Sequence, residues 1–264
     1  MALGVAFYTG IRSSQPDMQA SADALYDQIN LMDIRVLGEL GMTQQDVDAL
    51  ADIEGVTQAQ GGYTAYALSE RGGAQSVVSV ISLCGDMNQV TLTQGRLPEA
   101  PDECFLDEGY MKSAGIALGD TIALRSGKED EALSDTLAED AFTVVGAGSS
   151  AWYLNLDRGT ADIGNGDVKF FICVPPESFS LEVYTVAYLT CDGADGLNCY
   201  GDEYEDYIDG VKDRIEAIAG ERCDTRYQEV QAEGAEKIAD ARQEIADGEA
   251  ELADAEQQLA DAEV

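Results

Sequence analysis

The residues of this chain that are able to do chemistry are almost all carboxylates. Its 264 residues include 51 Asp and Glu, 15 Lys and Arg, and no histidine. The chain therefore lacks the commonest general base, the commonest zinc ligand, and the usual partner of a nucleophilic serine or cysteine. Catalysis by two facing carboxylates, as in glycosidases, is the route left open. No pair stands out among so many acids, so the sequence assigns no catalytic residue and the chain is not predicted to be an enzyme.

The spacing of the cysteines matches neither a metal-binding motif nor a redox motif. Their number is even, and no two of them form a C-x-x-C pair. They are either disulfides of an oxidising compartment or buried free thiols. Cys191 and Cys199 flank a turn-rich loop, so a bridge between these two is geometrically easy, and the other pairings stay open. The six cysteines are Cys84, Cys104, Cys173, Cys191, Cys199 and Cys223.

Two patterns that suggest ligand sites do not meet their requirements. The run Ser126–Lys128 resembles a phosphate loop, but no glycine stands where G-x-x-x-x-G-K requires one, and Glu129 replaces the metal-binding hydroxyl. The acidic loops at 157–167, 192–195 and 202–209 lack the spacing of a twelve-residue calcium loop. Clusters of Asp and Gly are usually solvated turns. We therefore predict no cofactor and no metal site, with calcium in one acidic loop as an alternative.

The charge balance excludes two classes of partner. A formal net charge of −36 leaves no basic footprint for nucleic acid. The same acidity argues against docking on anionic lipid through the protein surface. The hydrophobic fraction of 45% is that of a folded protein.

Periodicity places these residues on a mixed α and β framework. The first part predicts a helix over 16–30, a strand over 31–37 ending at Gly38, and a helix from Thr43 to Gly55 that opens with a Thr43/Asp46 capping box. Two strands follow, 56–68 and 76–84. The last part predicts a strand over 183–189, a helix from Tyr204 that Gly220 ends, and an edge strand over 223–227. This β-α-β, insertion, β-α-β order is that of a ferredoxin-like split βαβ sheet.

The middle of the chain has a different texture, with short strands and many turns. A single short helix is expected at 108–114, and the stretches 126–139 and 155–167 are expected to be loops. This part of the chain is therefore predicted to form an inserted, mostly β subdomain. The expected strands lie at 90–92, 104–106, 121–124, 142–145 and 170–174.

The last thirty residues repeat every seventh position. Large apolar residues mark one seam position and Ala or Gly follows each of them three places later, which predicts a coiled-coil helix with a closely packed partner. The acidic neighbours, such as Glu244 and Glu249, would repel an identical parallel helix. We therefore expect an antiparallel return helix from a longer protein, with a solvated single helix as the alternative. The seam residues are Ile238, Ile245, Leu252 and Leu259.

The opposite end begins with an apolar run, Ala2–Ile11, closed by Arg12. A bilayer span needs about 20 apolar residues, so the run alone is too short. Its flanks also lack the layout of a secretory signal. It is either the outer end of a transmembrane helix or a buried first element.

One stretch resembles a known family motif. Gly95-Arg96-Leu97-Pro98 is followed by a spacer, Glu103, a hydrophobic strand and a short helix; then come Gly115-Ile116-Ala117-Leu118-Gly119-Asp120 and later Val144-Val145-Gly146. This order resembles the extracytoplasmic core domain (the MacB-like periplasmic core) of FtsX/MacB-family ABC transporter permeases, over about residues 12–220. The motif residues in this chain are Gly95, Arg96, Pro98, Glu103, Gly115, Gly119 and Asp120.

The resemblance implies an α+β fold in which a ferredoxin-like "porter" subdomain carries an inserted, mostly β "sabre" subdomain. The corresponding ranges are 12–85 with 182–228 for the porter and 86–181 for the sabre. Residues 1–11 are then the stub of a transmembrane helix, and 229–264 a truncated coiled-coil helix.

The resemblance also implies the function of a membrane protein's extracellular domain. Such a domain lies on the extracytoplasmic side of the cell membrane and passes ATP-driven motion to an external partner or substrate, a mechanotransmission role in transport without chemistry of its own. Its partners are its own transmembrane segments, a separate ATP-binding subunit or domain, a second permease copy in a homodimer, and an extracellular protein or lipoprotein. On physical grounds Arg96 would hold a nearby carboxylate, Pro98 would stiffen its turn, and Gly115 and Gly119 would permit tight turns.

Two other functions compete with this one. A stand-alone cell-surface binding module on a coiled-coil stalk would explain the same helix, with calcium in an acidic loop. A carboxylate-based hydrolase would need two carboxylates facing each other across a cleft.

Overall fold

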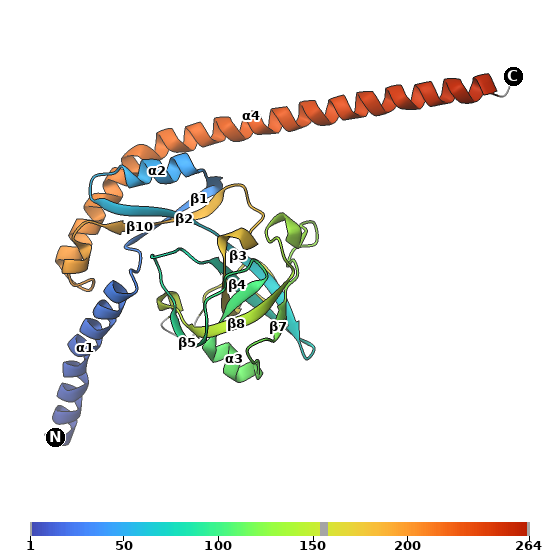
Figure 1. Ribbon diagram of the computed structural model, residues 1–264. Coiled ribbons are helices and arrows are strands. Elements are labelled where there is room, and N and C mark those ends of the chain that lie inside the picture. Colours follow the sequence, from blue (N-terminus) through green and yellow to red (C-terminus); the bar gives the residue numbers. More distant parts are fainter. Residues whose placement is uncertain (1, 154–157, 263–264) are drawn as a thin grey trace. The chain divides into compact units, whose positions relative to one another are not determined.

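The computed structural model describes the backbone of residues 2–153 and 158–262, and the side chains of residues 14–153, 158–253, 255 and 258. The chain divides into two units, Met1–Ile215 and Glu216–Val264. In its described part the first unit contains a three-stranded and a seven-stranded β-sheet (Figure 1). The described part of the second unit is helical.

The three-stranded sheet has the order β1-β10-β2, with β10 antiparallel to both neighbours. Helix α2 connects the two outer strands, so β1-α2-β2 is a βαβ unit split by β10. Figure 1 shows α2 and the start of α4 on the same face of this sheet. The elements are β1 (Ile34–Met42), α2 (Gln44–Ala51), β2 (Val56–Gly62), β10 (Tyr184–Cys191) and α4 (Asp202–Ala262).

Alternation along β10 explains why this sheet is covered on both faces. Ala187 and Leu189 face the helices and pack with Val47 of α2 and Val211 of α4. The intervening Tyr188 faces the opposite side. Since successive side chains of a strand point to opposite faces, one apolar run supplies both layers.

The capping box predicted for α2 is confirmed. The Asp46 carboxylate accepts a hydrogen bond from the Thr43 backbone N–H at 2.8 Å, and the Thr43 hydroxyl accepts one from the Asp46 N–H at 3.4 Å. Two N–H groups that the helix itself leaves unpaired are satisfied in this way. The helix therefore begins where the sequence predicts.

The seven-stranded sheet has the order β3-β4-β9-β6-β8-β5, and β7 pairs with β8 on the same side as β5. The pairs β4·β9 and β6·β8 are parallel and the others are antiparallel. The strands are β3 (Thr64–Arg71), β4 (Ala74–Ser82), β5 (Thr91–Gly95), β6 (Glu103–Asp107), β7 (Thr121–Ala123), β8 (Ala141–Ser149) and β9 (Val168–Val174). The remaining helices are α1 (Ala2–Gln28) and α3 (Glu108–Ala114), with short 3-10 helices at Leu133–Asp135, Ala151–Tyr153, Pro176–Ser178 and Ala194–Gly196.

The central strands of this sheet are buried on both faces. Phe170 and Ile172 of β9 pack on one side with Met111 of α3, while Phe171 packs on the other side with Phe105 of β6. A strand buried on both faces is expected to be continuously apolar, as the segment from 170 to 174 is. Truncating one of these phenylalanines to alanine is expected to cost about 3–5 kcal/mol of stability.

One buried ion pair is part of this core. The Arg158 Nε–H donates a hydrogen bond to Asp107 Oδ2 at 3.0 Å. The Nη2 atom of the same guanidinium lies 2.9 Å from this oxygen. Asp107 caps α3 through a hydrogen bond from the Gly109 N–H. Arg158 also lies over the rings of Tyr153 and Phe171. The pair therefore connects β6, α3 and the aromatic layer.

The first predicted strand is displaced. The sequence predicts a strand over 31–37 that stops at Gly38, whereas β1 begins at Ile34 and continues to Met42. Its partner β10 continues alongside, pairing Met42 with Tyr184 beyond an irregularity between Leu37 and Met42. Tertiary pairing therefore carries the strand past the glycine that was expected to end it.

The boundary between the two sheets also differs from the predicted one. The sequence assigned 12–85 to the outer sheet, but β3 and β4 form a hairpin within the seven-stranded sheet. The expected strand 56–68 is interrupted at Tyr63, whose ring packs on Phe179 and Tyr184 with centroids 5.0 and 5.3 Å apart. The chain changes sheets there, and β3 and β4 belong to the seven-stranded sheet.

The third correction concerns the end of the fold. Gly220 does not end the helix, and residues 223–227, predicted as an edge strand, are helical. A glycine inside a helix costs about 1 kcal/mol but does not by itself terminate it. Arg226 supports the helix through ion pairs with Glu229 at 3.2 Å and Glu233 at 3.1 Å. Within the described residues the outer sheet therefore lacks the fourth strand of a complete ferredoxin-like fold.

The apolar run at the start of the chain is helical. Helix α1 begins at Ala2, includes Pro16 and ends at Gln28, so it covers most of the helix predicted at 16–30. The side chains of residues 2–13 lie outside the described ones, so the expected transmembrane stub stays a prediction. Among the described helices, none combines the length and the apolar character that crossing a bilayer requires.

Candidate functional site

The motif residue Arg96 is held by Glu103, and we call this pair and its turn the Arg96–Glu103 bracket. Both guanidinium Nη atoms of Arg96 contact the carboxylate, with Nη1 2.7 Å from Oε2. Glu103 also accepts hydrogen bonds from the backbone N–H groups of Glu99 at 2.9 Å and Ala100 at 3.3 Å. The Arg96 guanidinium and then the Glu99 N–H lower the pKa of Glu103 to about 2. The carboxylate is thus ionised and satisfied at neutral pH, as in a structural bracket.

Three separated parts of the motif meet on β8. Gly95 pairs with Gly146, and the Arg96 N–H donates to the Val145 carbonyl at 3.0 Å. The Gly119 N–H, in the turn before β7, donates to the Val144 carbonyl at 2.8 Å. Gly95 has φ +79°, and a Cβ there would lie 2.2 Å from the Val145 oxygen, so only glycine fits.

The second half of the motif forms the end of α3 and the turn after it. Gly115 is the left-handed C-cap of α3, with φ +63°, and Gly119 has φ +91°. Asp120 accepts a hydrogen bond from the Ala117 N–H at 3.1 Å and lies 3.6 Å from Arg71. Pro98, in the Arg96–Glu103 bracket, is buried. These contacts are all structural.

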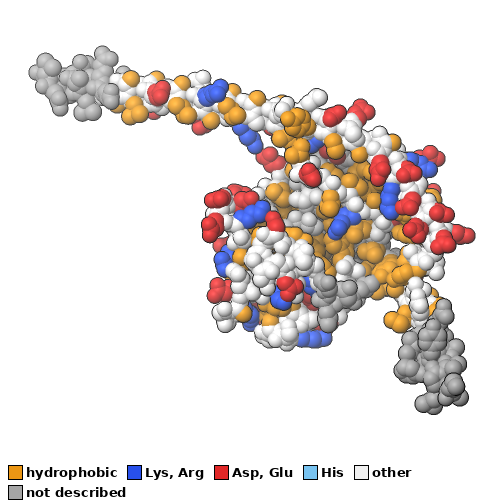
Figure 2. Space-filling model, turned by 180° about the vertical axis from the view of Figure 1, so that it is seen from behind, with side chains coloured by type: hydrophobic (Ala, Val, Ile, Leu, Met, Phe, Trp, Pro, Cys, Tyr) orange, Lys and Arg blue, Asp and Glu red, His pale blue; other side chains and the backbone are white. Residues whose placement is uncertain are grey.

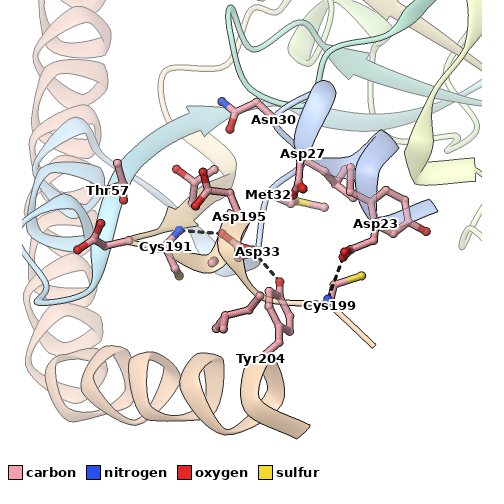
Figure 3. Close-up of a pocket in the computed structure, with 17 residues that line it drawn as sticks. Asp23, Asp27, Asn30, Met32, Asp33, Thr57, Cys191, Asp195, Cys199 and Tyr204 are labelled. Atoms are coloured by element: carbon pink, nitrogen blue, oxygen red, sulfur yellow. Dashed lines mark hydrogen bonds between the residues drawn. The ribbon is translucent and has the colours of Figure 1, made fainter. Parts of the chain in front are cut away.

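A second feature, the acidic pocket, is a cavity of about 330 Å³ in the first unit. It lies where the end of α1, the segment before β1, the loop after β10 and the first turn of α4 come together (Figure 3). None of the described residues that line it is Lys or Arg. Its carboxylates are those of Asp23, Asp27, Asp33, Asp192 and Asp195.

Asp33 accepts two hydrogen bonds, and it is more enclosed than Asp23, which also accepts one. Those of Asp33 come from the Tyr204 hydroxyl and the Cys191 N–H, both at 2.7 Å (Figure 3). Burial raises the pKa of Asp33, while these two hydrogen bonds act in the opposite direction, and Asp195 raises it further. The carboxylate therefore holds the chain in place and has a higher proton affinity than usual.

On the α1 side of the pocket, Asp27 also lies near other carboxylates. Burial, followed by the nearby charges of Asp23, Asp195 and Asp33, raises the pKa of Asp27. Asp23 accepts a hydrogen bond from the Cys199 N–H at 2.9 Å. No cation offsets these charges within the lining residues, so the pocket concentrates negative potential.

The chemistry available in the pocket is limited. Burial raises the pKa of the Cys191 thiol to about 12, and burial followed by the Asp23 hydrogen bond raises that of Cys199 to about 12 as well. Protonated thiols are poor nucleophiles. No group of three or more acidic, Cys or His side chains in the described part of the chain is placed to hold a metal ion. The arrangement raises the proton affinity of Asp27 and Asp33.

All six cysteines are free thiols in this structure. Cys191 and Cys199 lie on either side of the Asp33–Tyr204 hydrogen bond in Figure 3. The bridge that the loop spacing allows is not formed.

The heptad residues lie on the helix of the second unit. Ile238, Ile245 and Leu252 are exposed there. The side chain of Leu259, the fourth predicted seam residue, lies outside the described ones. The bracket, the acidic pocket and the heptad seam are thus three separate features, and the sequence predicted residues of the first and third.

The acidic pocket was missed by the sequence analysis. Asp23 and Asp27 are one helical turn apart, which places them on one face of α1, and this was the available signal. Asp33 and Tyr204 are far apart in the sequence and come together through the β1·β10 pairing. That pairing cannot be read from local spacing.

Comparisons with known proteins give similarity of fold at low sequence identity. The extracellular domain of the noncanonical ABC-type transporter YknZ from Gram-positive bacteria is 13% identical, with 67% of this chain and 87% of that chain covered and a TM-score of 0.38. The periplasmic region of MacB from Actinobacillus actinomycetemcomitans is 13% identical, with 74% and 84% covered and a TM-score of 0.37. The first of these structures is described as an extracellular domain and the second as a periplasmic region. No protein-family model and no curated protein matches the chain.

Proposed function

We propose that this chain is the extracytoplasmic domain of an FtsX/MacB-like ABC transporter permease. The observation that carries the proposal is the meeting of Gly95–Arg96, Gly119–Asp120 and Val144–Gly146 on β8. Three pieces of sequence carry the resemblance, and backbone hydrogen bonds join these same pieces into one structural unit. On this proposal the three-stranded sheet is the porter and the seven-stranded sheet the inserted sabre.

The proposed role is mechanical. The porter sheet, covered by α2 and α4, would receive motion from transmembrane segments that a separate ATP-binding subunit or domain drives, in a permease homodimer. The helix of residues 216–262 would pass the motion to an extracellular protein or lipoprotein, over about 70 Å at 1.5 Å per residue. The satisfied bracket and the protonated thiols support a domain without chemistry of its own.

Cys223 offers a direct test of the location. It is exposed in the second unit. In intact source cells, a membrane-impermeant maleimide is expected to label Cys223 without permeabilisation, and the Cys223→Ser variant serves as the control. If labelling requires permeabilised cells, the domain is on the wrong side of the membrane and the proposal fails.

A second experiment tests the mechanical role. A spin label on Cys223, in membranes that contain the complete transporter, is expected to change mobility or interspin distance between the ATP-bound and the vanadate-trapped states. A Cys223→Ser background with a label at exposed position 75 of the β3–β4 hairpin provides the comparison. Identical spectra in all nucleotide states would show that no motion reaches this domain.

A further inference from the structure

The helix of the second unit presents a large apolar face to solvent. Ile238, Ile245 and Leu252 are 55%, 62% and 66% exposed. Figure 2 shows hydrophobic side chains at intervals along the described part of this helix. Large aliphatic side chains are normally buried, and a regular row of them on one helix face indicates a docking surface.

The spacing of the row indicates what kind of element docks there. The second seam position is occupied by Ala241, Gly248 and Ala255, which leave shallow depressions between the large residues. Side chains of a facing helix fill such depressions in knobs-into-holes packing, and small residues allow the two axes to approach closely. The occupant is therefore a helix.

Charge disfavours the pairing of this helix with a second copy in parallel orientation. In a parallel pair, the residue before each large seam position faces the residue five places further along the other helix. Lys237 then faces Arg242, and Glu244 faces Glu249. Both contacts are between like charges, so this geometry is destabilised along the whole described seam.

An antiparallel second copy removes only part of this repulsion. It places large residues opposite small ones, which improves the packing. With Ile245 opposite Gly248, however, Arg242 faces Glu249 while Glu244 faces Glu251, so attraction and repulsion balance. Residues 216–262 also carry fourteen acidic and four basic residues, and pairing two copies brings these excess charges together.

We propose that the face formed by Ile238, Ile245 and Leu252 is the docking site for a helix of another protein that carries basic residues where its edges meet the acidic positions of this seam. Such a helix fills the depressions and offers cations to Glu244, Glu249 and Glu251. No other stretch of these 264 residues has basic residues at heptad spacing, so none of them matches the docking helix. The inference names the class of the external partner and in that respect rests on the proposed function.

The test uses two dye-labelled synthetic helices, four heptads long, with the same Leu/Ala seam. One has Lys at every edge position and the other has Glu. We expect the Lys peptide to bind the full 264-residue chain at least about tenfold more tightly in fluorescence anisotropy, which corresponds to about 1.4 kcal/mol. Equal affinity for the two peptides would overturn the proposal.

Two matched variants separate docking from general attraction of opposite charges. Ile245→Glu adds a carboxylate on the seam, and Gln243→Glu adds one on the opposite side of the same helix. Both positions are exposed, and circular dichroism checks that the helix is retained. We expect Ile245→Glu to weaken binding at least about tenfold and Gln243→Glu less than about twofold. Equal losses would show that only net charge attracts the peptide.

Two further outcomes would assign the face to another occupant. A chain that sediments as a dimer, and becomes a monomer with Ile245→Glu, would show that a second copy covers the face. If protein isolated from source cells does not bind the Lys peptide while the 264-residue chain does, another segment of the native protein covers it. The test uses soluble components, so its failure is distinguishable from a failure of the Cys223 labelling experiment.

Discussion

The two sheets of the first unit each enclose an aspartate, and the surroundings of these two carboxylates are opposite. Asp107 of the seven-stranded sheet is 4% exposed and faces the Arg158 guanidinium. Asp33, beside the three-stranded sheet, is held by a hydroxyl and an N–H while other carboxylates lie around it. The seven-stranded sheet therefore uses an ion pair to fix its core. The three-stranded sheet retains repulsion between carboxylates, which protonation can relieve.

The largest expected effect comes from breaking the pair in the seven-stranded sheet. Arg158→Met keeps an apolar side chain over Tyr153 and Phe171 but leaves Asp107 buried without its cation. We expect a loss of about 3 kcal/mol in the free energy of unfolding, measured by urea denaturation. Asp107→Asn combined with Arg158→Met is the control and should recover part of the loss. A loss below about 1 kcal/mol for the single variant would contradict the assigned role.

Asp33→Asn is expected to raise the free energy of unfolding, whereas Arg158→Met lowers it. The amide oxygen can accept from the Cys191 N–H, and the amide nitrogen can donate to the Tyr204 hydroxyl, so both contacts persist without the negative charge. We expect a gain of about 0.5 kcal/mol at pH 7, the size of relieving repulsion between partly exposed charges. Thermal unfolding with and without the substitution measures it.

The pH dependence of that gain follows from linkage. The pKa of Asp33 is raised in the folded protein, so the folded state binds a proton more tightly than the unfolded one. Its contribution to stability is therefore greatest in acid and decreases as the pH rises from the ordinary value of 3.8 through the raised value. The Asn variant should lack this decrease. A gain that does not change with pH would place its origin elsewhere.

Glu103→Gln tests the reverse situation in the Arg96–Glu103 bracket. The folded pKa of Glu103 is about 2, below its ordinary value of 4.5. The carboxylate therefore stabilises the fold above pH 4.5, and this contribution is lost as the pH falls from 4.5 towards 2. We expect the variant to be less stable at pH 7 and to show a smaller further loss in acid. Parallel acid-unfolding curves for the two proteins would contradict this.

Local signals predicted those parts of the molecule that local contacts determine. The Thr43/Asp46 capping box, the helix at 108–114 and the apolar strand at 170–174 lie where the sequence places them. Each depends on a cap or a run of a few residues. The Arg96–Glu103 pair is also local, because only six residues separate its members.

The wrong predictions concern features that contacts between distant segments of the chain determine. Gly38 was predicted to end a strand and Gly220 to end a helix. Strand β1 instead continues past Gly38 to pair with β10 again at Met42. Helix α4 continues past Gly220, where ion pairs of Arg226 support it. The acidic pocket joins Asp23 and Asp33 with Cys191 and Tyr204. Long-range pairing of this kind outweighs local propensity and leaves no signature in the spacing.

The smallest effects are expected in thiol reactivity, which reports on the two sheets separately. In the folded protein Cys223 should react first with a maleimide, because it is exposed, and half-buried Cys199 more slowly. Burial raises the pKa of Cys104 and Cys191 to about 12, so both should be protected until their sheets open. The rates are measured by mass spectrometry of pulse-labelled protein.

Cys191 lies in the three-stranded sheet beside the crowded carboxylates, and Cys104 lies in the seven-stranded sheet. If that crowding weakens the first sheet, mild urea at pH 7 should expose Cys191 before Cys104. Lowering the pH from 7 should narrow the interval between the two labelling events, since protonation relieves the repulsion around Asp33. Asp33→Asn should narrow this interval at pH 7 as well. Simultaneous labelling under every condition would mean that the two sheets open as one cooperative unit, and that the electrostatic contrast between them has no effect on local stability.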